Sequence, residues 1–537
     1  MPVLPTRGVP FDSTQVSRRG FLVAGIAGGF ALTGCGPSDP KPAANAALDS
    51  AIAAAEAARP HSGRTVNLSL TPQPATIDLG GVIAQTQAFG DAIPGPLIRA
   101  SIGDELVIKV TNRLDQPTSV HWHGITLRND MDGAEPATPN IPAGQEFTYR
   151  FSVPDPGTYW AHPHVGLQDD LGLYLPIVID DPTESVDYDA EWIVVLDDWT
   201  DGVGKSPQQL LDELTSPNKP SMPMQTSTPT TSGTTTTTSP TTITVTPGTG
   251  TSPATATPAA AEAEVGKSDL LGGDAGDIDY PYYLINGRIP AAPTTFDAKS
   301  GQRIRIRFIN AGADTAFRVA LAGHSMTVTH TDGYPVVPTQ VDALLIGMAE
   351  RYDVIVTAAD GIFPLVAAAE GKNAVARALL STGTGSVPDP NFRPAELTRR
   401  VGTVEMFTAT APADLGRADA SLTLPVVLGG NMMKYDWTIN GQPYSRTDPL
   451  HVREGQRPTL AFDNQTMMFH PMHLHGHTFQ IVNPDGSPGA RKDTVIVLPN
   501  QKLNAVLVAD NPGVWMFHCH NKYHQDAGMQ TRIDYLF

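Results

Sequence analysis

The chain has 537 residues, enough for three or four domains of ordinary size. Its hydrophobic fraction of 40% and charged fraction of 17% argue against a disordered or fibrous protein. The net charge of −19 argues against a nucleic-acid partner, because an acidic surface repels phosphate and attracts cations. The 49 glycines and 48 prolines suit many short strands joined by turns.

Residues 1–35 indicate an export signal. The stretch SRRGFLV (17–23) contains a twin-arginine pair, and the apolar run Phe21–Leu32 is too short and glycine-rich to span a bilayer permanently. The run ends in LTGC, which resembles a bacterial lipobox with Cys35 as the lipid-modified residue. We therefore expect twin-arginine export and lipid anchoring at the extracytoplasmic face of the cell membrane. The alternative is a plain signal peptide, which would leave the protein secreted or periplasmic.

Two low-complexity segments lie further along the chain. Residues 36–60 are rich in alanine and proline, and we interpret them as a tether. Residues 215–264 include TTSGTTTTTSPTTITVTPGTG and contain almost no large apolar side chains. Such a segment cannot offset its own ordering entropy, so we expect a disordered insertion.

An internal repeat organises the remainder of the chain. GDELVIKVTN (103–112), GQRIRIRFIN (301–310) and GQRPTLAFDN (455–464) each place a glycine nine residues before an asparagine, with an alternating apolar strand between them. A second pair of segments, PGTYWAHPH and PGVWMFHCH, matches position for position. The repeat predicts an all-β chain of three sandwich or small-barrel domains. We place their boundaries at 61–183, 184–395 and 396–537.

Ten of the 15 histidines fall in four tight clusters. In a strand, residues i and i+2 face the same side, so each His-x-His can present two imidazoles to one site. Four clusters at equivalent points of two repeats indicate metal binding rather than structural histidines. The clusters are HWHG, HPH, HPMHLH and HCHNKYH, and their histidines are His121, His123, His162, His164, His470, His473, His475, His518, His520 and His524; His477 adjoins the third cluster and is not counted in it.

One cysteine is placed among these histidines. Cys519, His524 and Met529 follow the spacing C-x4-H-x4-M, and His470 can supply a second imidazole. A closed zinc site would use four ligands, often several of them cysteines. Two histidines, a thiolate and a weak axial thioether are instead the ligands of a blue-copper electron-transfer site. Because His518 and His520 flank the cysteine, electrons collected singly can pass through one peptide link to the histidine cluster. Dioxygen, which takes four electrons to become water, suits such a cluster.

All four clusters together resemble those of the multicopper oxidases, the group of laccases and bacterial cuprous oxidases. The resemblance covers residues 62–537 apart from the insertion, and it implies three cupredoxin domains of Greek-key β-sandwich type and four copper ions. By matched position, the type 1 copper takes His470, Cys519, His524 and Met529, and the type 2 copper takes His121 and His473. The two type 3 coppers take His123, His162 and His520, and His164, His475 and His518.

The same resemblance assigns Asp132 to the proton supply for oxygen reduction. Bacterial members commonly carry a second carboxylate directly after the last type 1 histidine, where this chain has Gln525, an amide that cannot deliver a proton at neutral pH. Asp526 follows it and could substitute, although its side chain should point the other way. The sequence therefore does not assign a proton donor at the position of Gln525.

The donor of electrons is less constrained than the reaction. Met468, two residues before His470, matches a methionine of the family's substrate-copper site, but the neighbouring acidic position is Thr466. Soft cuprous ion prefers thioether ligands, so we expect cuprous oxidation, with phenol oxidation alongside and a role in copper tolerance. The alternative is that these methionines only pack the hairpin. Other functions considered are a laccase-like enzyme without a tolerance role, a non-catalytic copper-binding lipoprotein, and a nitrite reductase.

Overall fold

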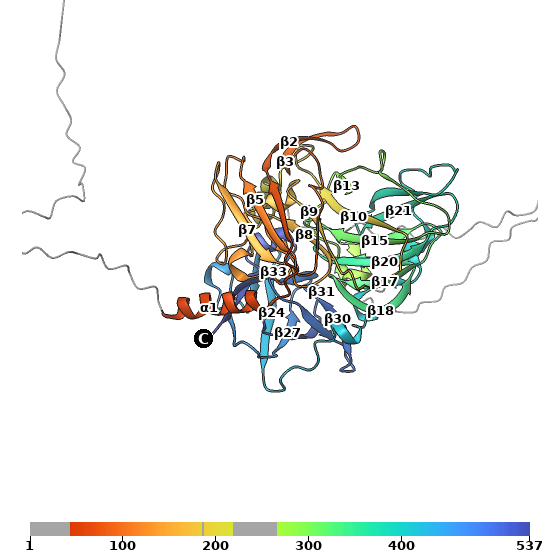
Figure 1. Ribbon diagram of the computed structural model, residues 1–537. Coiled ribbons are helices and arrows are strands. Elements are labelled where there is room, and N and C mark those ends of the chain that lie inside the picture. Colours follow the sequence, from red (N-terminus) through yellow and green to blue (C-terminus); the bar gives the residue numbers. More distant parts are fainter. Residues whose placement is uncertain (1–42, 185–186, 218–265) are drawn as a thin grey trace, which may run out of the picture. The chain divides into compact units, whose positions relative to one another are not determined.

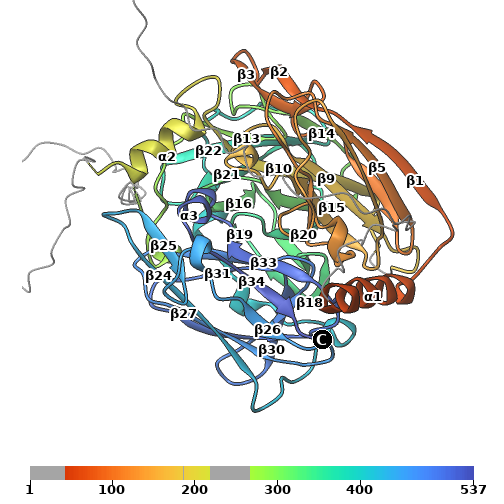
Figure 2. The same ribbon diagram turned by 90° about the vertical axis from the view of Figure 1, so that its left-hand side faces the viewer.

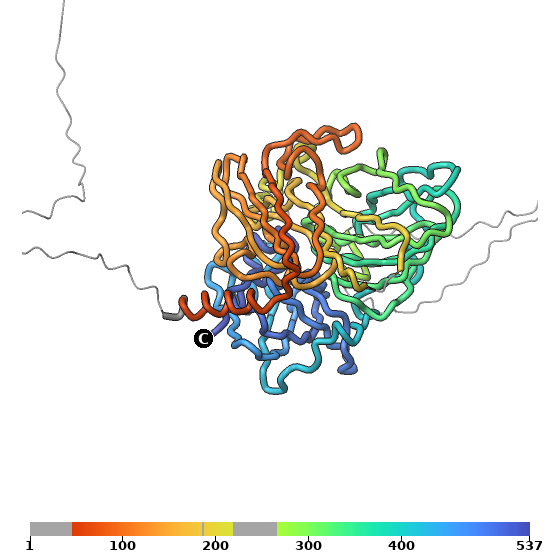
Figure 3. The backbone as a smooth tube through the Cα atoms, in the orientation of Figure 1, coloured from red at the N-terminus to blue at the C-terminus, as the bar shows by residue number. Residues whose placement is uncertain are grey.

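The computed structural model describes residues 43–184, 187–217 and 266–537. The twin-arginine segment, Cys35 and the Thr/Pro-rich insertion beyond residue 217 lie outside the described residues. Strands dominate the described chain, which confirms the all-β prediction (Figure 1). Figure 3 traces the path of the backbone through these strands, from red at the start to blue at the C-terminus. Among the described residues, no helix combines the length and the apolar character needed to cross a membrane.

The first domain contains two sheets and a separate hairpin. In the three-stranded sheet, β5 pairs parallel with β1 and antiparallel with β7, and the four-stranded sheet has the order β4-β9-β8-β6. The strands are β1 (Thr65–Leu70), β4 (Ile98–Ser101), β5 (Glu105–Thr111), β6 (His121–His123), β7 (Glu146–Ser152), β8 (Gly157–His162), β9 (Leu175–Asp180), and the hairpin pair β2 (Pro72–Asp78) and β3 (Ile83–Phe89).

The described part of the middle domain contains two six-stranded sheets. In the first of them, β15 lies between parallel β10 and antiparallel β20. The first sheet is β13 (Tyr282–Ile285), β10 (Ala190–Trp199), β15 (Arg303–Asn310), β20 (Arg351–Thr357), β17 (Met326–Thr331) and β18 (Tyr334–Val341). The second is β14 (Thr295–Asp297), β22 (Ala374–Ser381), β21 (Ile362–Ala369), β16 (Phe317–Leu321), β19 (Ala343–Ile346) and β23 (Val401–Gly402). A two-stranded pair, β11 (Lys267–Ser268) and β12 (Gly273–Asp274), lies between β10 and β13 in the chain.

The third domain repeats this arrangement, with β27 between parallel β24 and antiparallel β32. Its six-stranded sheet is β25 (Asp436–Ile439), β24 (Thr423–Asn431), β27 (Thr459–Asn464), β32 (Lys502–Leu507), β29 (Phe479–Val482) and β30 (Pro488–Lys492). Its five-stranded sheet is β26 (Leu450–Val452), β34 (Gln530–Tyr535), β33 (Val514–Cys519), β28 (His470–Leu474) and β31 (Thr494–Val497). The strand of the sequence repeat therefore has the same two kinds of neighbour in all three domains.

The repeated asparagines explain why this motif recurs. Asn112, Asn310 and Asn464 end the repeated strands and are fully or almost fully buried. In each case Oδ1 accepts a hydrogen bond from the backbone N–H two residues later, at 2.9, 2.9 and 3.0 Å. In each case Nδ2 also donates to at least two backbone carbonyls. One side chain thus satisfies several buried backbone groups where the chain leaves the sheet.

In the described part of the chain, three α-helices accompany the sheets (Figure 2). They are α1 (Ala43–Ala58), α2 (Pro207–Thr215) and α3 (Lys522–Asp526). The prediction of a tether over 36–60 is wrong for residues 43–58, which form the α-helix α1. This segment is rich in alanine, the residue with the highest helix propensity. The end of the helix is also bonded to the body: Glu56 accepts from the Ser152 N–H at 2.9 Å, and Arg59 donates to Asn511 Oδ1 at 2.9 Å.

Candidate metal centre

Cys519, His470 and His524 form a compact buried group in the third domain. The two Nδ1 atoms lie 3.1 Å apart, and Cys519 Sγ lies 3.6 Å from Nδ1 of His470 and 3.8 Å from Nδ1 of His524. Ligands that each lie about 2.0–2.3 Å from one ion are separated by about 3–4 Å, so these three atoms fit a single metal ion. A thiolate and two imidazoles are the donors that suit copper.

Two sheet strands and one short helix position these donors. His470 begins β28 and Cys519 ends β33, which is the neighbouring strand. His524 lies in α3, whose first turn is capped by the Asn521 side chain, an acceptor for the N–H groups of Tyr523 and His524. The cap is the reason that the chain turns sharply after His520 and returns His524 to the cysteine.

Met529 lies where the sequence spacing requires. Its side chain is fully buried, its N–H donates to the His524 carbonyl at 2.9 Å, and its carbonyl accepts from the Cys519 N–H at 3.0 Å. These two hydrogen bonds attach the segment after α3 to the backbone of both His524 and Cys519. The backbone therefore holds Met529 beside Cys519, in keeping with a role at the same ion.

The outer nitrogens of both imidazoles are held by polar side chains. Nε2 of His470 lies 2.8 Å from Thr466 Oγ1, and Nε2 of His524 lies 3.0 Å from Oδ2 of Asp277, which belongs to the middle domain. Fixing Nε2 leaves Nδ1 of each ring directed at the shared site. Burial lowers the pKa of His470 well below its usual value and raises that of the Cys519 thiol. A metal binding here would therefore meet neutral imidazole and would have to displace the thiol proton.

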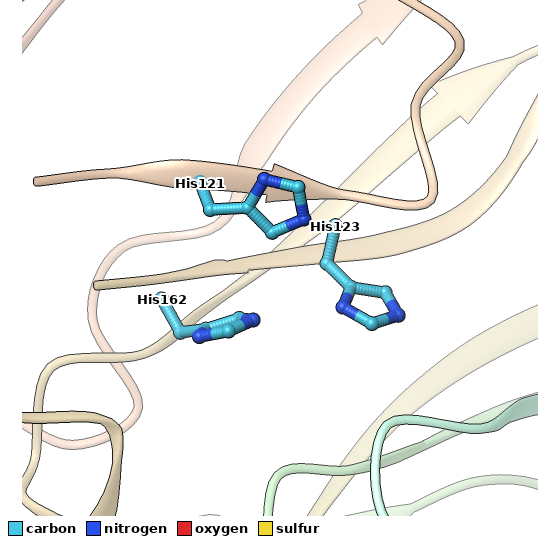
Figure 4. Close-up of side chains that lie close together, drawn as sticks. All are labelled: His121, His123 and His162. Carbon is cyan, nitrogen blue, oxygen red and sulfur yellow. The ribbon is translucent and has the colours of Figure 1, made fainter. Parts of the chain in front are cut away.

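The other eight predicted histidines converge where the first and third domains meet. Figure 4 shows His121 and His123 from β6 beside His162 from β8. Three groups of side chains each have ligand atoms within 4.8 Å of one another: His121, His123 and His162; His121, His473 and His475; and His164, His475 and His518. His520 completes the cluster, with its ring centroid 5.1 Å from that of His123 and 5.1 Å from that of His162.

The free nitrogens of this cluster provide a test of whether metal fits. Among the described residues, five buried ring nitrogens have no hydrogen-bond partner: Nε2 of His121, His162, His473 and His520, and Nδ1 of His123. Three further Nε2 atoms lie close together: that of His518 is 3.3 Å from that of His164 and 3.0 Å from that of His475, and that of His164 is also 3.4 Å from Nε2 of Gln525. Buried polar atoms without partners are costly, and metal coordination would satisfy all eight. The cluster fits the copper ions that the sequence predicts.

Burial favours the neutral form of six of these rings. Burial and then the neighbouring imidazoles lower the pKa values of His123, His162, His164, His518 and His520 well below their ordinary value. Burial and the nearby His121 lower the pKa of His475 to about 3, despite its contact with a carboxylate. A neutral imidazole keeps the lone pair that a metal ion needs.

Asp132 contacts two histidines of this cluster. Its Oδ2 lies 2.8 Å from Nδ1 of His475, and its backbone carbonyl lies 2.9 Å from Nδ1 of His121. Burial acts to raise the pKa of the Asp132 carboxyl, but the charges and hydrogen bonds of His475 and His121 outweigh it and the pKa falls. Asp132 therefore orients one ligand from each of two domains.

The two groups are joined through the backbone of one strand end. Cys519 belongs to the first group, whereas its neighbours His518 and His520 belong to the second. Each connection is a single peptide link, as the HCH motif predicted. A covalent path therefore runs between the two candidate sites.

The sequence pointed to Gln525 and Asp526, and the structure adds Lys522 and Asp169, which the sequence did not suggest. Gln525 is buried with Nε2 3.4 Å from Nε2 of His164, and Asp526 forms an ion pair at 3.5 Å with Lys522. Lys522 also pairs with Asp169 at 3.5 Å, and burial raises the pKa of Asp169 to about 6. Sequence reasoning also missed Asp277 and Asp493, because their partners are distant in the chain and carry no local motif.

Comparison with known proteins places this site in a family. Family models described as multicopper oxidase match residues 72–184, 262–385 and 417–535. A curated protein named Multicopper oxidase MmcO, from Mycobacterium tuberculosis, is 69% identical over 536 residues and covers all of both chains. Copper resistance protein A from Escherichia coli is 28% identical, covering 86% of this chain and 91% of its own. The crystal structure of a laccase from Botrytis aclada aligns with a TM-score of 0.67 and 25% identity over 89% of each chain. With three cupredoxin-like domains and a histidine and cysteine donor set that fits copper, the chain belongs to the multicopper oxidases.

Proposed function

We propose that this oxidase holds four copper ions, takes single electrons from a donor beside the Cys519 group, and reduces O2 to water at the eight-histidine cluster. The observation that carries the proposal is the continuity of His518, Cys519 and His520, since one tripeptide contributes to both groups. When bound, copper supplies the one-electron redox chemistry at both sites. The ligand roles are those expected above: His470, Cys519, His524 and Met529 for type 1, His121 and His473 for type 2, and the other six histidines for type 3.

The reaction balances with cuprous ion as the donor. Four cuprous ions each lose one electron to become cupric, and one O2 gains four electrons and four protons to give two waters. We expect Asp132 to relay protons at the cluster, because its carboxylate is buried beside His475. The relation to copper resistance proteins supports cuprous ion as a donor and a role in copper tolerance. The relation to laccases supports phenols as additional donors.

The surface before β28 indicates where a donor approaches. Met468 was expected to meet the substrate ion, but its side chain is only 1% exposed, which favours the packing alternative. Met467 is 69% exposed and lies three residues before His470. Met433, on the hairpin between β24 and β25, is 72% exposed. Exposed thioethers are soft donors for cuprous ion, so we assign first capture to Met467 rather than to Met468.

The N-terminal residues support an extracytoplasmic location for this chemistry. The twin-arginine and lipobox motifs of residues 17–35 would place the enzyme outside the cell membrane and attach it through Cys35. Membrane attachment would not alter the two metal groups, which lie wholly within residues 121–529.

Oxygen uptake by the copper-loaded protein tests the proposal directly. Uptake should proceed with cuprous ion and with a phenol, with one O2 consumed per four electrons donated. A protein that binds copper without consuming O2 would be the non-catalytic copper-binding alternative. Met467→Leu should slow cuprous oxidation and spare phenol turnover, and Met468→Leu serves as the buried matched control. Equal effects of Met467→Leu on both donors would contradict the assignment of Met467.

A further inference from the structure

The middle domain contributes none of the predicted copper ligands, yet one of its side chains reaches the histidine cluster. Arg351 begins β20 and is fully buried. Its Nη1 donates to Oδ1 of Asp493 at 2.8 Å, and its Nη2 donates to Oδ2 at 2.5 Å. Asp493 lies between β30 and β31 of the third domain and is also fully buried. A two-pronged pair of this kind fixes the direction of the carboxylate as well as its charge.

Asp493 in turn contacts one histidine from each copper-binding domain. Its Oδ1 lies 3.2 Å from Nε2 of His123, and its backbone carbonyl lies 3.0 Å from Nδ1 of His473. The opposite nitrogens, Nδ1 of His123 and Nε2 of His473, are among those without a partner in the described chain. The Thr494 hydroxyl lies 3.2 and 3.1 Å from the same two ring nitrogens, so Asp493 and Thr494 together favour the proton there and leave the opposite nitrogens for a metal.

Asp132 and Asp493 make equivalent contacts with the cluster. Each uses its backbone carbonyl for a histidine of its own domain and its carboxylate for a histidine of the other domain. The rings held in this way stack in pairs, His121 on His475 and His123 on His473, with both centroid separations 3.7 Å. The two carboxylates differ in one respect: among the described residues, an arginine donates to both oxygens of Asp493 but not to those of Asp132.

The surrounding structure leaves the Arg351–Asp493 pair little freedom. Asp332, from the turn between β17 and β18, accepts from the backbone N–H of Asp493 at 3.1 Å and from that of Arg351 at 2.8 Å. Arg351 Nε also donates to the carbonyl of Thr158 in β8, at 3.2 Å. A Cβ on Gly124, the residue after His123, would lie 2.3 Å from Arg351 Nη2 and 2.6 Å from Asp493 Oδ2. The glycine of HWHG is thus needed to make room for the pair.

We propose that Arg351 is a positioning residue for the oxygen-reducing cluster. The middle domain supplies none of the predicted copper ligands, but through the two hydrogen bonds of Arg351 to Asp493 it orients His123 and His473 toward copper. The proposal rests on the proposed function, because it assigns these two rings to copper. It does not place Arg351 in contact with copper, O2 or the donor.

The test compares Arg351→Lys with Arg305→Lys in the full-length, copper-loaded protein. Arg305 is the matched control because it is a buried arginine of the same sheet that pairs with a buried aspartate, Asp353, at 2.6 Å. Arg351→Lys should lower the affinity for the type 2 copper about 10- to 100-fold in chelator titrations. It should also change the type 2 electron paramagnetic resonance signal and leave the blue absorption of the Cys519 group intact. Arg305→Lys should keep parent affinity and signal.

Other results would overturn the proposal. Parent-like type 2 affinity and signal in Arg351→Lys would do so, as would equal loss of copper from both sites or the same loss in Arg305→Lys. If Arg351→Lys does not fold, Asp493→Asn decides, because it keeps the side-chain shape while weakening the hydrogen bonds to Arg351. Asp493→Asn should show the same selective loss, and a parent-like type 2 signal in that variant would overturn the proposal. Failure of the parent protein to bind copper at the histidine cluster would instead contradict the proposed function.

Discussion

Thr466 offers a sharp test of how the Cys519 group is held. In Thr466→Val the side chain keeps its shape but loses Oγ1, which lies 2.8 Å from Nε2 of the fully buried His470. Copper at Nδ1 requires the ring proton to sit on Nε2, where the variant leaves it without an acceptor. The copper-free ring can instead move the proton to Nδ1, so the penalty falls mainly on the copper-bound form.

The size of the effect follows from that unsatisfied donor. A buried donor without a partner costs about 1–3 kcal/mol, and about 1.4 kcal/mol corresponds to a factor of ten in affinity. Copper at the Cys519 group should therefore bind about 5- to 140-fold more weakly in Thr466→Val. Chelator titration followed by the blue absorption measures this affinity, and total copper content shows whether the histidine cluster stays loaded.

A matched control comes from Thr531 in β34 of the same domain. Thr531 is 1% exposed, and its Oγ1 bonds to Thr447 Oγ1 at 2.6 Å rather than to a predicted ligand. Thr531→Val should keep parent copper affinity. The reasoning would be refuted if Thr466→Val bound copper as tightly as the parent, or if Thr531→Val weakened binding equally.

Three other changes test the remaining assignments. Cys519→Ser should abolish the blue colour and oxygen uptake while the circular dichroism of the fold persists; a variant that stayed blue would contradict the ligand assignment. Met529→Leu should raise the reduction potential of the Cys519 group, measured by redox titration, because the thioether no longer donates density to cupric ion; a fall would argue against an axial thioether. Cys35→Ala should move the protein from the membrane fraction to a soluble or unprocessed form on fractionation; unchanged partitioning would mean another anchor.

The sequence was most informative where structure depends on local spacing. Residues two apart on a strand share a side, and this fact placed His121 with His123 and predicted the convergence of the histidines. The repeated asparagine was also readable, because Asn112 and its counterparts satisfy the backbone within their own loops. Both features involve residues that are close together in the sequence, so they can be predicted from the sequence alone.

The supporting groups were missed because they act across domains. Asp277 is 247 residues from His524, and Arg351 is 142 residues from Asp493, so no local motif connects them. Helix α1 was missed for another reason: alanine content was interpreted as a feature of a linker, although alanine is also the strongest helix former. The burial of Met468 likewise depends on three-dimensional packing that its proximity to His470 does not disclose.

His121 stacks on His475, and His123 stacks on His473, so each pair joins the first domain to the third. Under the proposed ligand assignment, copper binding would therefore affect the stability of this domain contact as well as catalysis. Copper ions held, as proposed, by histidines of both the first and third domains would bind only when the two are docked, so by mass action each bound ion would stabilise the docked arrangement. At a free copper concentration 1,000 times the dissociation constant, one such ion contributes about 4.1 kcal/mol. Removal of copper should therefore expose the interface between these domains to proteases, and the rate of proteolytic cleavage would report whether copper is bound.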